Sequence, residues 1–206
     1  MAQKEYKWSK LDNMPTSAEF FLVNRSSVPN KKASYSLNVF CYRYRLAKSF
    51  VGISAKEVGK TLLGYVAAMK VSLAYSAYDE LATAATELSI QDFKHKNYNI
   101  INNKAMAEKL IKNTKLMKLL RNKTIDKNLS DQIEMFLKGE SFDILCIARA
   151  IRNVFIHGTF TTTGGGVKNR QDAEIYYELA ETLLKYCDGT FTRCIKKLNL
   201  YPFKFL

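Results

Sequence analysis

The most apolar stretch of the chain covers residues 142–160, and its few polar residues follow a regular pattern. Arg149, Asn153 and His157 are each four residues apart. A helix at about 100° per residue places them along one stripe, with Arg152 about 60° from Arg149. Because the rest of this helix is apolar, other helices must cover it on several sides. Its polar groups are therefore expected to face a cleft or a subunit interface, where each needs a partner.

Apolar residues at helical intervals predict two further long helices. The first covers residues 59–90, where many of the regularly spaced apolar residues are alanines, so that another helix can approach closely. The second covers residues 169–187, with Asn169 as its N-cap and Asp172 in the position of a capping-box partner. Asp188 and Gly189 are expected to end it.

Serines and a glycine mark the expected limits of two other helices. Ser130 is the expected N-cap of a short helix that runs to about Leu137. Ser141 is the expected cap of the apolar helix, and Gly158 is expected to end that helix directly after His157.

Residues 104–122 combine a helical pattern with a high density of lysines. Lys104, Lys112, Lys115 and Lys118 lie near one another around the expected helix. Such a face can follow the phosphates of a nucleic acid. A solvated helix face explains the same pattern equally well.

Two stretches leave their structure open. Residues 34–45 are rich in aromatic residues that partly alternate, which is compatible with either a strand or a helix. The Tyr-Arg-Tyr-Arg run at residues 42–45 can stack bases and bind phosphates, although such a run is more often a half-buried surface. Residues 159–168 contain three consecutive glycines and are expected to form a flexible loop that could cover the cleft beside His157.

Together these elements predict an all-α fold. The chain has 206 residues, enough for one domain with a small appendage, and its 47% hydrophobic residues argue against disorder. We expect an N-terminal extension over residues 1–55, containing a short strand or helix. A helical domain is expected over residues 56–206.

The net charge of +13 favours a polyanionic partner, nucleic acid before membrane, although a soluble basic protein can have the same charge. The polar N-terminus does not resemble a signal peptide, and the longest apolar run contains Lys70, so no membrane span is expected. Four cysteines without a Cys-x-x-Cys pair, together with only two histidines, predict no metal site. We expect no cofactor and a reducing, cytoplasmic setting.

The segment from Arg152 to His157 reads Arg-Asn-Val-Phe-Ile-His and resembles the signature of the HEPN superfamily. In that signature an Arg is followed by four to six residues, the first usually polar, and then a His. The resemblance covers six residues, together with their place on a late helix of an all-helical chain that another amphipathic helix follows. It does not identify a subfamily.

The resemblance implies a four- or five-helix bundle, a homodimer and a metal-independent endoribonuclease. In that chemistry the 2′-hydroxyl of RNA attacks the adjacent phosphorus. His157 suits a general acid or base, and Arg152 suits stabilisation of the phosphorane oxygens. Asn153 can orient either group or the substrate. From its spacing alone, Arg149 is expected to contact a neighbouring phosphate.

Helix geometry favours the dimer independently. Arg152 and His157 lie about 140° apart around a straight helix, so one helix does not easily direct both side chains at one phosphate. Two such helices across a two-fold axis can combine residues from both chains.

HEPN folds often carry an acidic residue on an earlier helix that faces the Arg and His. Asp79 or Glu80, in the middle of the helix over residues 59–90, is the candidate, and a solvated acid is an equally good interpretation of each. Toxin or antiphage activity, with a possible antitoxin as regulatory partner, is implied by the resemblance alone. The alternatives are a non-catalytic dimerisation or RNA-binding adaptor, and a DNA-binding or structural helical protein in which the motif is a coincidence.

Overall fold

The computed structural model describes residues 12–53, 61–90 and 102–200, and every regular element in these ranges is helical. The described residues contain no strand, and an isolated bridge joins Asn102 to Asp143. The prediction of an all-α fold is confirmed. The elements are α1 (Ala18–Asn24), the 3-10 turn η2 (Arg25–Ser27), α2 (Lys31–Ser49), α3 (Thr61–Glu87), α5 (Lys104–Lys112), α6 (Thr114–Lys123), α7 (Lys127–Leu137), α8 (Ile144–Ile156) and α9 (Arg170–Lys197).

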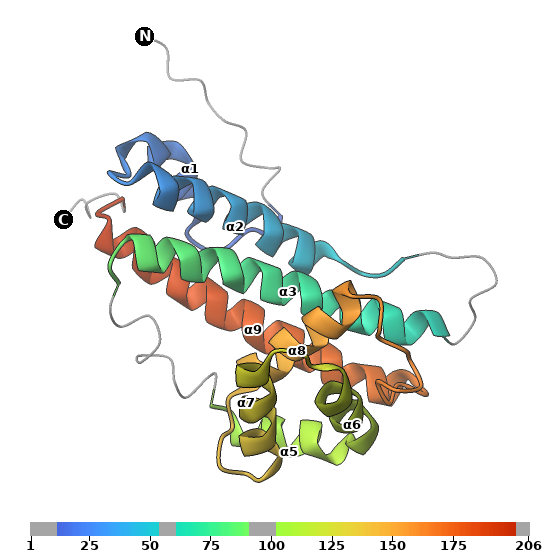
Figure 1. The fold of residues 1–206 in the computed structure, drawn as a ribbon. Coiled ribbons are helices and arrows are strands. Elements are labelled where there is room, and N and C mark those ends of the chain that lie inside the picture. The colour runs from blue at the N-terminus through green and yellow to red at the C-terminus, as the bar shows by residue number, and fades with distance from the viewer. Residues whose placement is uncertain (1–11, 54–60, 91–101, 201–206) are drawn as a thin grey trace.

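Three long helices, α2, α3 and α9, lie side by side and form the main body of the molecule (Figure 1). Helix α3 packs against both of the others and against α8, while α5, α6 and α7 gather at one side. The predicted helix over residues 59–90 is present from Thr61 to Glu87. Small side chains let neighbouring helices approach closely, and α3 has a set of buried alanines, as expected. The buried alanines are Ala67, Ala68, Ala74, Ala77, Ala84 and Ala85.

Residues 34–45 are helical, which decides between the two structures that the sequence allowed. Helix α2 begins where the side chain of Asn30 accepts hydrogen bonds from Lys32 N (2.9 Å) and Ala33 N (3.0 Å). Its buried face reaches the common hydrophobic core, where the Phe40 ring lies 5.0 Å from the Phe191 ring of α9, centroid to centroid. The expected boundary between an extension and a domain, at residues 55–56, lies outside the described residues.

The basic helix expected over residues 104–122 is in fact two helices, and the prediction of one continuous lysine face is wrong. Asn113 breaks it. The side chain of Asn113 accepts a hydrogen bond from Leu116 N (3.2 Å) and so caps α6, while its own N–H donates to Leu110 O (3.0 Å) at the end of α5. An Asn side chain that replaces a backbone acceptor in this way favours a helix start over a helix interior.

Aspartates, and not the expected serines, begin α7 and α8. Asp126 Oδ1 accepts from Leu129 N (3.1 Å), and Asp143 Oδ1 accepts from Leu145 N (2.9 Å). Both serine predictions were wrong, because a carboxylate at these positions satisfies the free N–H groups and is favoured by the helix dipole. Burial raises the pKa of Asp143. Gly158 ends α8 as predicted, with a positive φ of 66°.

Helix α9 begins as predicted but continues ten residues beyond its predicted last residue, Cys187, to Lys197. The capping box of Asn169 and Asp172 is present. The carboxylate of Asp188 does not stop the helix, because it accepts hydrogen bonds from Thr16 N and Thr16 Oγ1, both 2.7 Å long. Beyond it, Phe191, Cys194 and Ile195 are buried, so the core holds this last part of the helix in place.

The glycine loop packs against α6 and α9 and does not lie over the polar face of α8, so that expectation is corrected. The hydroxyl of Tyr176 donates to Gly165 O (2.6 Å), and Asn113 Nδ2 donates to the same oxygen (3.4 Å). Gly166 has a φ of 74°, and a Cβ there would lie only 2.0 Å from Asn113 Oδ1. Close contact with Asn113 therefore requires glycine at this position.

In the part of the chain that the structure describes, no helix combines the length and the hydropathy that crossing a membrane requires.

The cysteines, Cys41, Cys146, Cys187 and Cys194, are buried free thiols whose pKa values are raised by burial. They are inert core residues.

Candidate active site

The polar stripe of α8 opens onto a groove of about 580 Å³ between α3 and α8. The groove follows the second half of α3, from Tyr75 to Glu87. Three of the residues selected from the α8 pattern line it: Arg149, Arg152 and Asn153. The expectation that these side chains face a cleft therefore agrees with the structure.

The arginines of this groove are held differently. Arg149 donates from Nη2 to Asp126 Oδ2 at 2.9 Å, so its charge is already paired. Arg152 donates from Nη1 to Asn153 Oδ1 at 3.0 Å, and Asn153 carries no charge. Arg152 Nε is buried and has no hydrogen-bond partner among the described residues. No carboxylate pairs with Arg152 among the described residues, so its charge, unlike that of Arg149, remains available to an anionic ligand.

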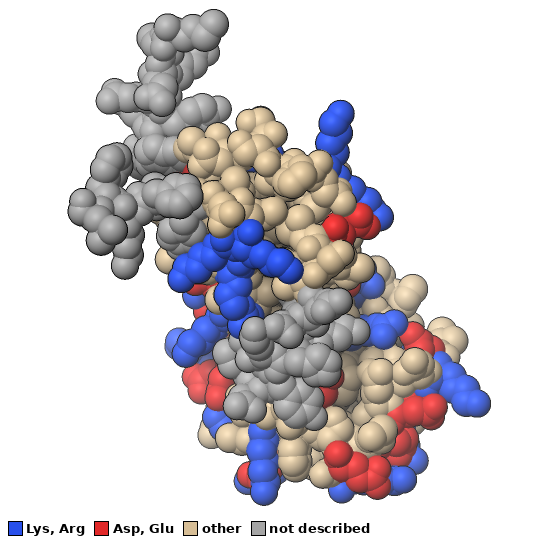
Figure 2. Space-filling model, turned by 90° about the vertical axis from the view of Figure 1, so that its left-hand side faces the viewer, with Lys and Arg blue, Asp and Glu red and all other residues tan. Residues whose placement is uncertain are grey.

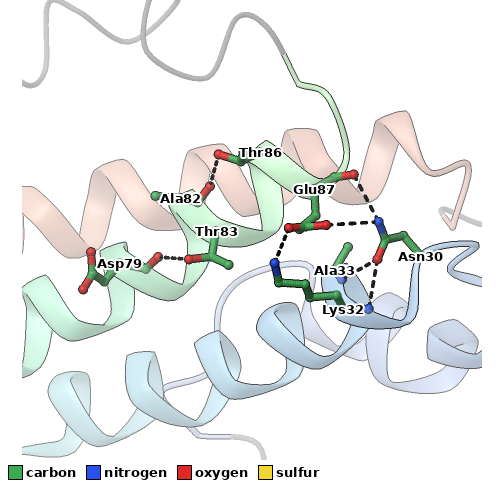
Figure 3. A network of polar contacts seen from close by, with 8 residues as sticks. All are labelled: Asn30, Lys32, Ala33, Asp79, Ala82, Thr83, Thr86 and Glu87. Carbon is green, nitrogen blue, oxygen red and sulfur yellow. Dashed lines mark hydrogen bonds and ion pairs between the residues drawn. The ribbon is translucent and has the colours of Figure 1, made fainter.

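The α3 wall of the groove carries hydroxyls and carboxylates. Thr83 and Thr86 donate hydrogen bonds to backbone oxygens one turn earlier, and Glu87 forms an ion pair with Lys32 at 2.6 Å (Figure 3). Glu87 also accepts from Asn30 Nδ2 at 3.4 Å, and the contact with Lys32 is the main cause that lowers the pKa of Glu87. One end of the wall is thus fixed to α2.

The structure separates the two candidate acids on α3. Asp79 lines the groove, and its carboxylate makes no hydrogen bond or ion pair with the described residues. Glu80 points to the other side of α3, where it pairs with Arg43 at 3.1 Å. Of the two candidate acids, Asp79 is therefore the one that shares a groove with Arg152.

His157 lies outside the groove. It is the exposed C-cap of α8, directly before Gly158. Tyr65, near the start of α3, donates from its hydroxyl to Phe160 O at 3.5 Å, so the end of α8 points to the first part of α3 and away from Asp79. Within one chain the structure brings Arg152 and Asn153 together and leaves His157 beside them, facing solvent.

Two tyrosines of the groove were not selected from the sequence. The rings of Tyr75 and Tyr78 lie 5.6 Å apart, centroid to centroid, and both line the groove. Burial and the nearby carboxylate of Asp79 raise the pKa of Tyr75 to about 12, and Arg149 and Arg152 partly oppose this shift. Tyr75 lies four residues, or about one helical turn, before Asp79. This spacing places both on one face of α3, and it is the feature of the sequence from which Tyr75 could have been predicted as a groove residue.

The four candidate RNA-binding lysines do not form one cluster. Lys112 and Lys115 line a separate pocket of about 270 Å³, where Lys109 and Lys168 lie beside them. Lys104 lies over the ring of Phe142, 5.9 Å from its centroid. Lys118 is exposed on α6, one turn after Lys115. Lys104 and Lys112 begin and end α5, so the length of that helix separates them, whereas Lys115 and Lys118 lie on α6 after the break at Asn113.

The Tyr-Arg-Tyr-Arg run is also divided by its helix. Tyr44 is buried in the core, Arg43 is paired with Glu80, and Tyr42 is 56% exposed. This distribution is typical of the half-buried surface that the sequence allowed as the alternative.

Charge is unevenly spread over the surface. On the face shown in Figure 2, Lys and Arg side chains gather near the middle, while acidic and basic side chains alternate around the lower edge.

Among the described residues, no group of three His, Cys, Asp or Glu side chains is arranged to hold a metal ion.

No protein-family model, curated protein or solved structure compared with this chain matches it.

Proposed function

We propose that this protein is a metal-independent endoribonuclease of HEPN type with a helical-bundle fold of that kind. The observation that supports this most directly is the pair of Arg152 and Asn153 in the groove between α3 and α8, facing a second helix that carries Asp79. The Arg and Asn of the Arg-Asn-x-x-x-His motif thus share a groove with an acid, and Arg152 has no carboxylate partner among the described residues.

The proposed reaction requires only groups of the protein and the RNA. The 2′-oxygen attacks the adjacent phosphorus, the bond from phosphorus to the 5′-oxygen breaks, and a 2′,3′-cyclic phosphate and a 5′-hydroxyl result. The attacking hydroxyl loses a proton and the leaving 5′-oxygen gains one, and His157 mediates a proton transfer of this kind. Arg152 stabilises the negative charge that develops on the phosphorane oxygens, and Asn153 orients its guanidinium.

We further propose that two chains form one site. Arg152 lines the groove while His157, five residues later, faces solvent at the end of α8, and a second copy of the chain places its own His157 opposite Arg152. Ile156, next to His157, is 59% exposed, which gives this end of α8 an apolar side chain for such a contact. RNA is the expected substrate and a homodimer the expected state.

The pocket between α5, α6 and the glycine loop is the proposed contact for RNA phosphates. Its exposed Lys112 and Lys115 have no acidic partner among the described residues, whereas Lys109 pairs with Glu178 at 2.7 Å. Asp172 also lines this pocket, where its carboxylate accepts hydrogen bonds from the backbone of Lys168 and Asn169. The lysines outnumber the acid, so the concave surface attracts a polyanion.

Replacing Lys112 and Lys115 together by alanine is expected to weaken RNA binding about tenfold near physiological salt and to reduce the salt dependence of affinity by about 1.4 units of slope, since each phosphate contact to a single strand contributes about 0.7. Fluorescence anisotropy with labelled single-stranded RNA at several salt concentrations measures both quantities. The matched control replaces exposed Lys127, the first residue of α7, and exposed Lys138, its C-cap, which removes the same charge. Equal losses in the two variants would show that only net charge matters and would contradict a local contact.

A non-catalytic dimerisation or RNA-binding adaptor is the second candidate, and Asp79 favours it. The unpaired carboxylate lines the same groove as Arg152 and repels a phosphate placed beside it. The two candidates differ in one result, which is whether purified protein cuts RNA in the absence of metal ions.

We propose a cytoplasmic setting, which the four buried thiols suit, and a role as a toxin or antiphage effector that an antitoxin or another protein regulates. The biological role rests on the motif's resemblance alone.

The test of the proposed activity is cleavage of a mixed RNA pool in EDTA, with the ends of the products analysed for cyclic phosphate.

A further inference from the structure

The groove between α3 and α8 is asymmetric, and the asymmetry bears on which base the site accepts. Its α8 wall supplies guanidinium and amide donors, which suit a phosphate. Its α3 wall supplies carboxylates, which suit N–H donors and repel a phosphate. A nucleotide carries both kinds of group, with its phosphate separated from its base. The volume of about 580 Å³ lies in the range typical of sites that hold small organic ligands.

Only one carboxylate of this wall is available to a ligand. Glu87 is occupied by Lys32 and Asn30. Asp79 is exposed, and among the described residues only its backbone oxygen is engaged, by Thr83 Oγ1 at 3.0 Å. Figure 3 shows the Asp79 carboxylate at one end of the wall, apart from the pair of Glu87 and Lys32. Asp79 is therefore the carboxylate of this wall that remains available to a ligand donor.

We propose that Asp79 recognises a guanine next to the phosphate that is cut. This inference rests on the proposed function, because it requires RNA in the groove. Guanine presents two neighbouring donors, N1–H and the N2 amino group, which match the two oxygens of one carboxylate. Adenine and cytosine place a ring nitrogen acceptor beside their amino group, and uracil places a carbonyl on each side of its N3–H. Each of these acceptors repels the second carboxylate oxygen.

The neighbours of Asp79 fit a base. Tyr75 and Tyr78 line the same groove from the core side: Tyr75 is 8% exposed, and the Tyr78 ring packs against the rings of Tyr75 and Tyr186. They give the groove a rigid, largely apolar floor, which suits a base better than a charged group. Tyr75 lies within the electrostatic influence of Asp79, Arg149 and Arg152 together, so the carboxylate and the guanidinium groups belong to one site. A base held at Asp79 leaves its phosphate on the side of Arg152.

The test measures binding without cleavage. The full chain carrying His157→Ala is titrated with four labelled oligouridines, whose central residue is U, G, A or C. The G-containing oligomer is expected to bind at least about tenfold more tightly than the all-U oligomer. Adding Asp79→Asn, whose amide has only one acceptor oxygen, is expected to remove this preference, so that the G-containing and the all-U oligomers bind about equally.

Glu80→Gln is the matched control, because it removes a neighbouring carboxylate that faces Arg43 and not the groove. It is expected to keep the guanine preference. Equal binding of the four oligomers, or a preference that survives Asp79→Asn, overturns the inference, and absence of any RNA binding overturns it together with the proposed function. If the protein prefers guanine but cuts no RNA, the proposed nuclease activity is refuted and guanine recognition is supported. If it cuts RNA but shows no base preference, the nuclease activity is supported and guanine recognition is refuted.

Discussion

Arg152→Ala is expected to lower the rate of RNA cleavage by about 10²–10³-fold, because it removes the group that stabilises the phosphorane charge. The loss should appear mainly in kcat and less in KM, since the contact is strongest in the transition state. Arg152→Lys should restore only part of the rate. The lysine ammonium keeps the positive charge, but it lacks the planar guanidinium whose several N–H groups can hydrogen-bond to Asn153 and to a phosphate at the same time. Single-turnover cleavage of a labelled RNA measures these rates.

Arg149→Ala is the matched control for that result. Arg149 is on the same helix and lines the same groove, but its charge is already paired with Asp126. Its removal is expected to affect KM more than kcat and to cost about tenfold or less. Thermal unfolding of the variants tests whether they are folded. Equal effects of the two substitutions on kcat would contradict a special role for Arg152.

Mixing two inactive variants is expected to restore activity. In a dimer of Arg152→Ala with His157→Ala, one of the two composite sites has an intact Arg152 from one chain and an intact His157 from the other. Random exchange makes half of the dimers mixed, so about one quarter of the composite sites become functional. Cleavage by the mixture should therefore reach about one quarter of the unmutated rate, while each variant alone stays near background.

The outcome depends on subunit exchange, which is measured separately by mixing differently tagged chains and recovering one tag. If mixed dimers form and cleavage stays at background, each chain uses its own Arg152 and His157. A monomer with full activity would contradict the shared site as well. In either case the exposed position of His157 would have to change when RNA binds.

The pattern along the chain was sufficient to predict features that depend on local sequence. The polar stripe of α8 faces a groove as its spacing required, and the capping box of α9 is where Asn169 and Asp172 predicted it. Both follow from residues within a turn or two of one another. The all-α class follows from the same local signals.

Other predictions failed where distant or competing contacts decide the structure. Asp188 next to Gly189 has the composition of a helix end, but Thr16, 172 residues away, binds Asp188 and the core covers the residues beyond it. Asn113 divides the basic helix because its side chain caps α6. The lysines around it then belong to two elements, which a single helical projection could not show.

The composition of the groove could be predicted only in part. Asp79 and Glu80 were indistinguishable in sequence, and the choice between them depends on the side of α3 to which α8 packs. The contributions of Tyr75 and Thr83 depend on the same packing. Residues on one helix predict a face, but the partner of that face is fixed by tertiary contacts.

The most direct test of the central claim is cleavage of a mixed RNA pool in EDTA by the unmutated protein and by His157→Ala. We predict that only the unmutated protein cuts and that its products end in 2′,3′-cyclic phosphate and 5′-hydroxyl groups. His157→Ala should reduce the rate by about 10²–10⁴-fold, the usual contribution of a general acid or base. Equal cleavage by both proteins, or no cleavage by either together with equal RNA binding, would contradict a catalytic role for the Arg152–His157 motif.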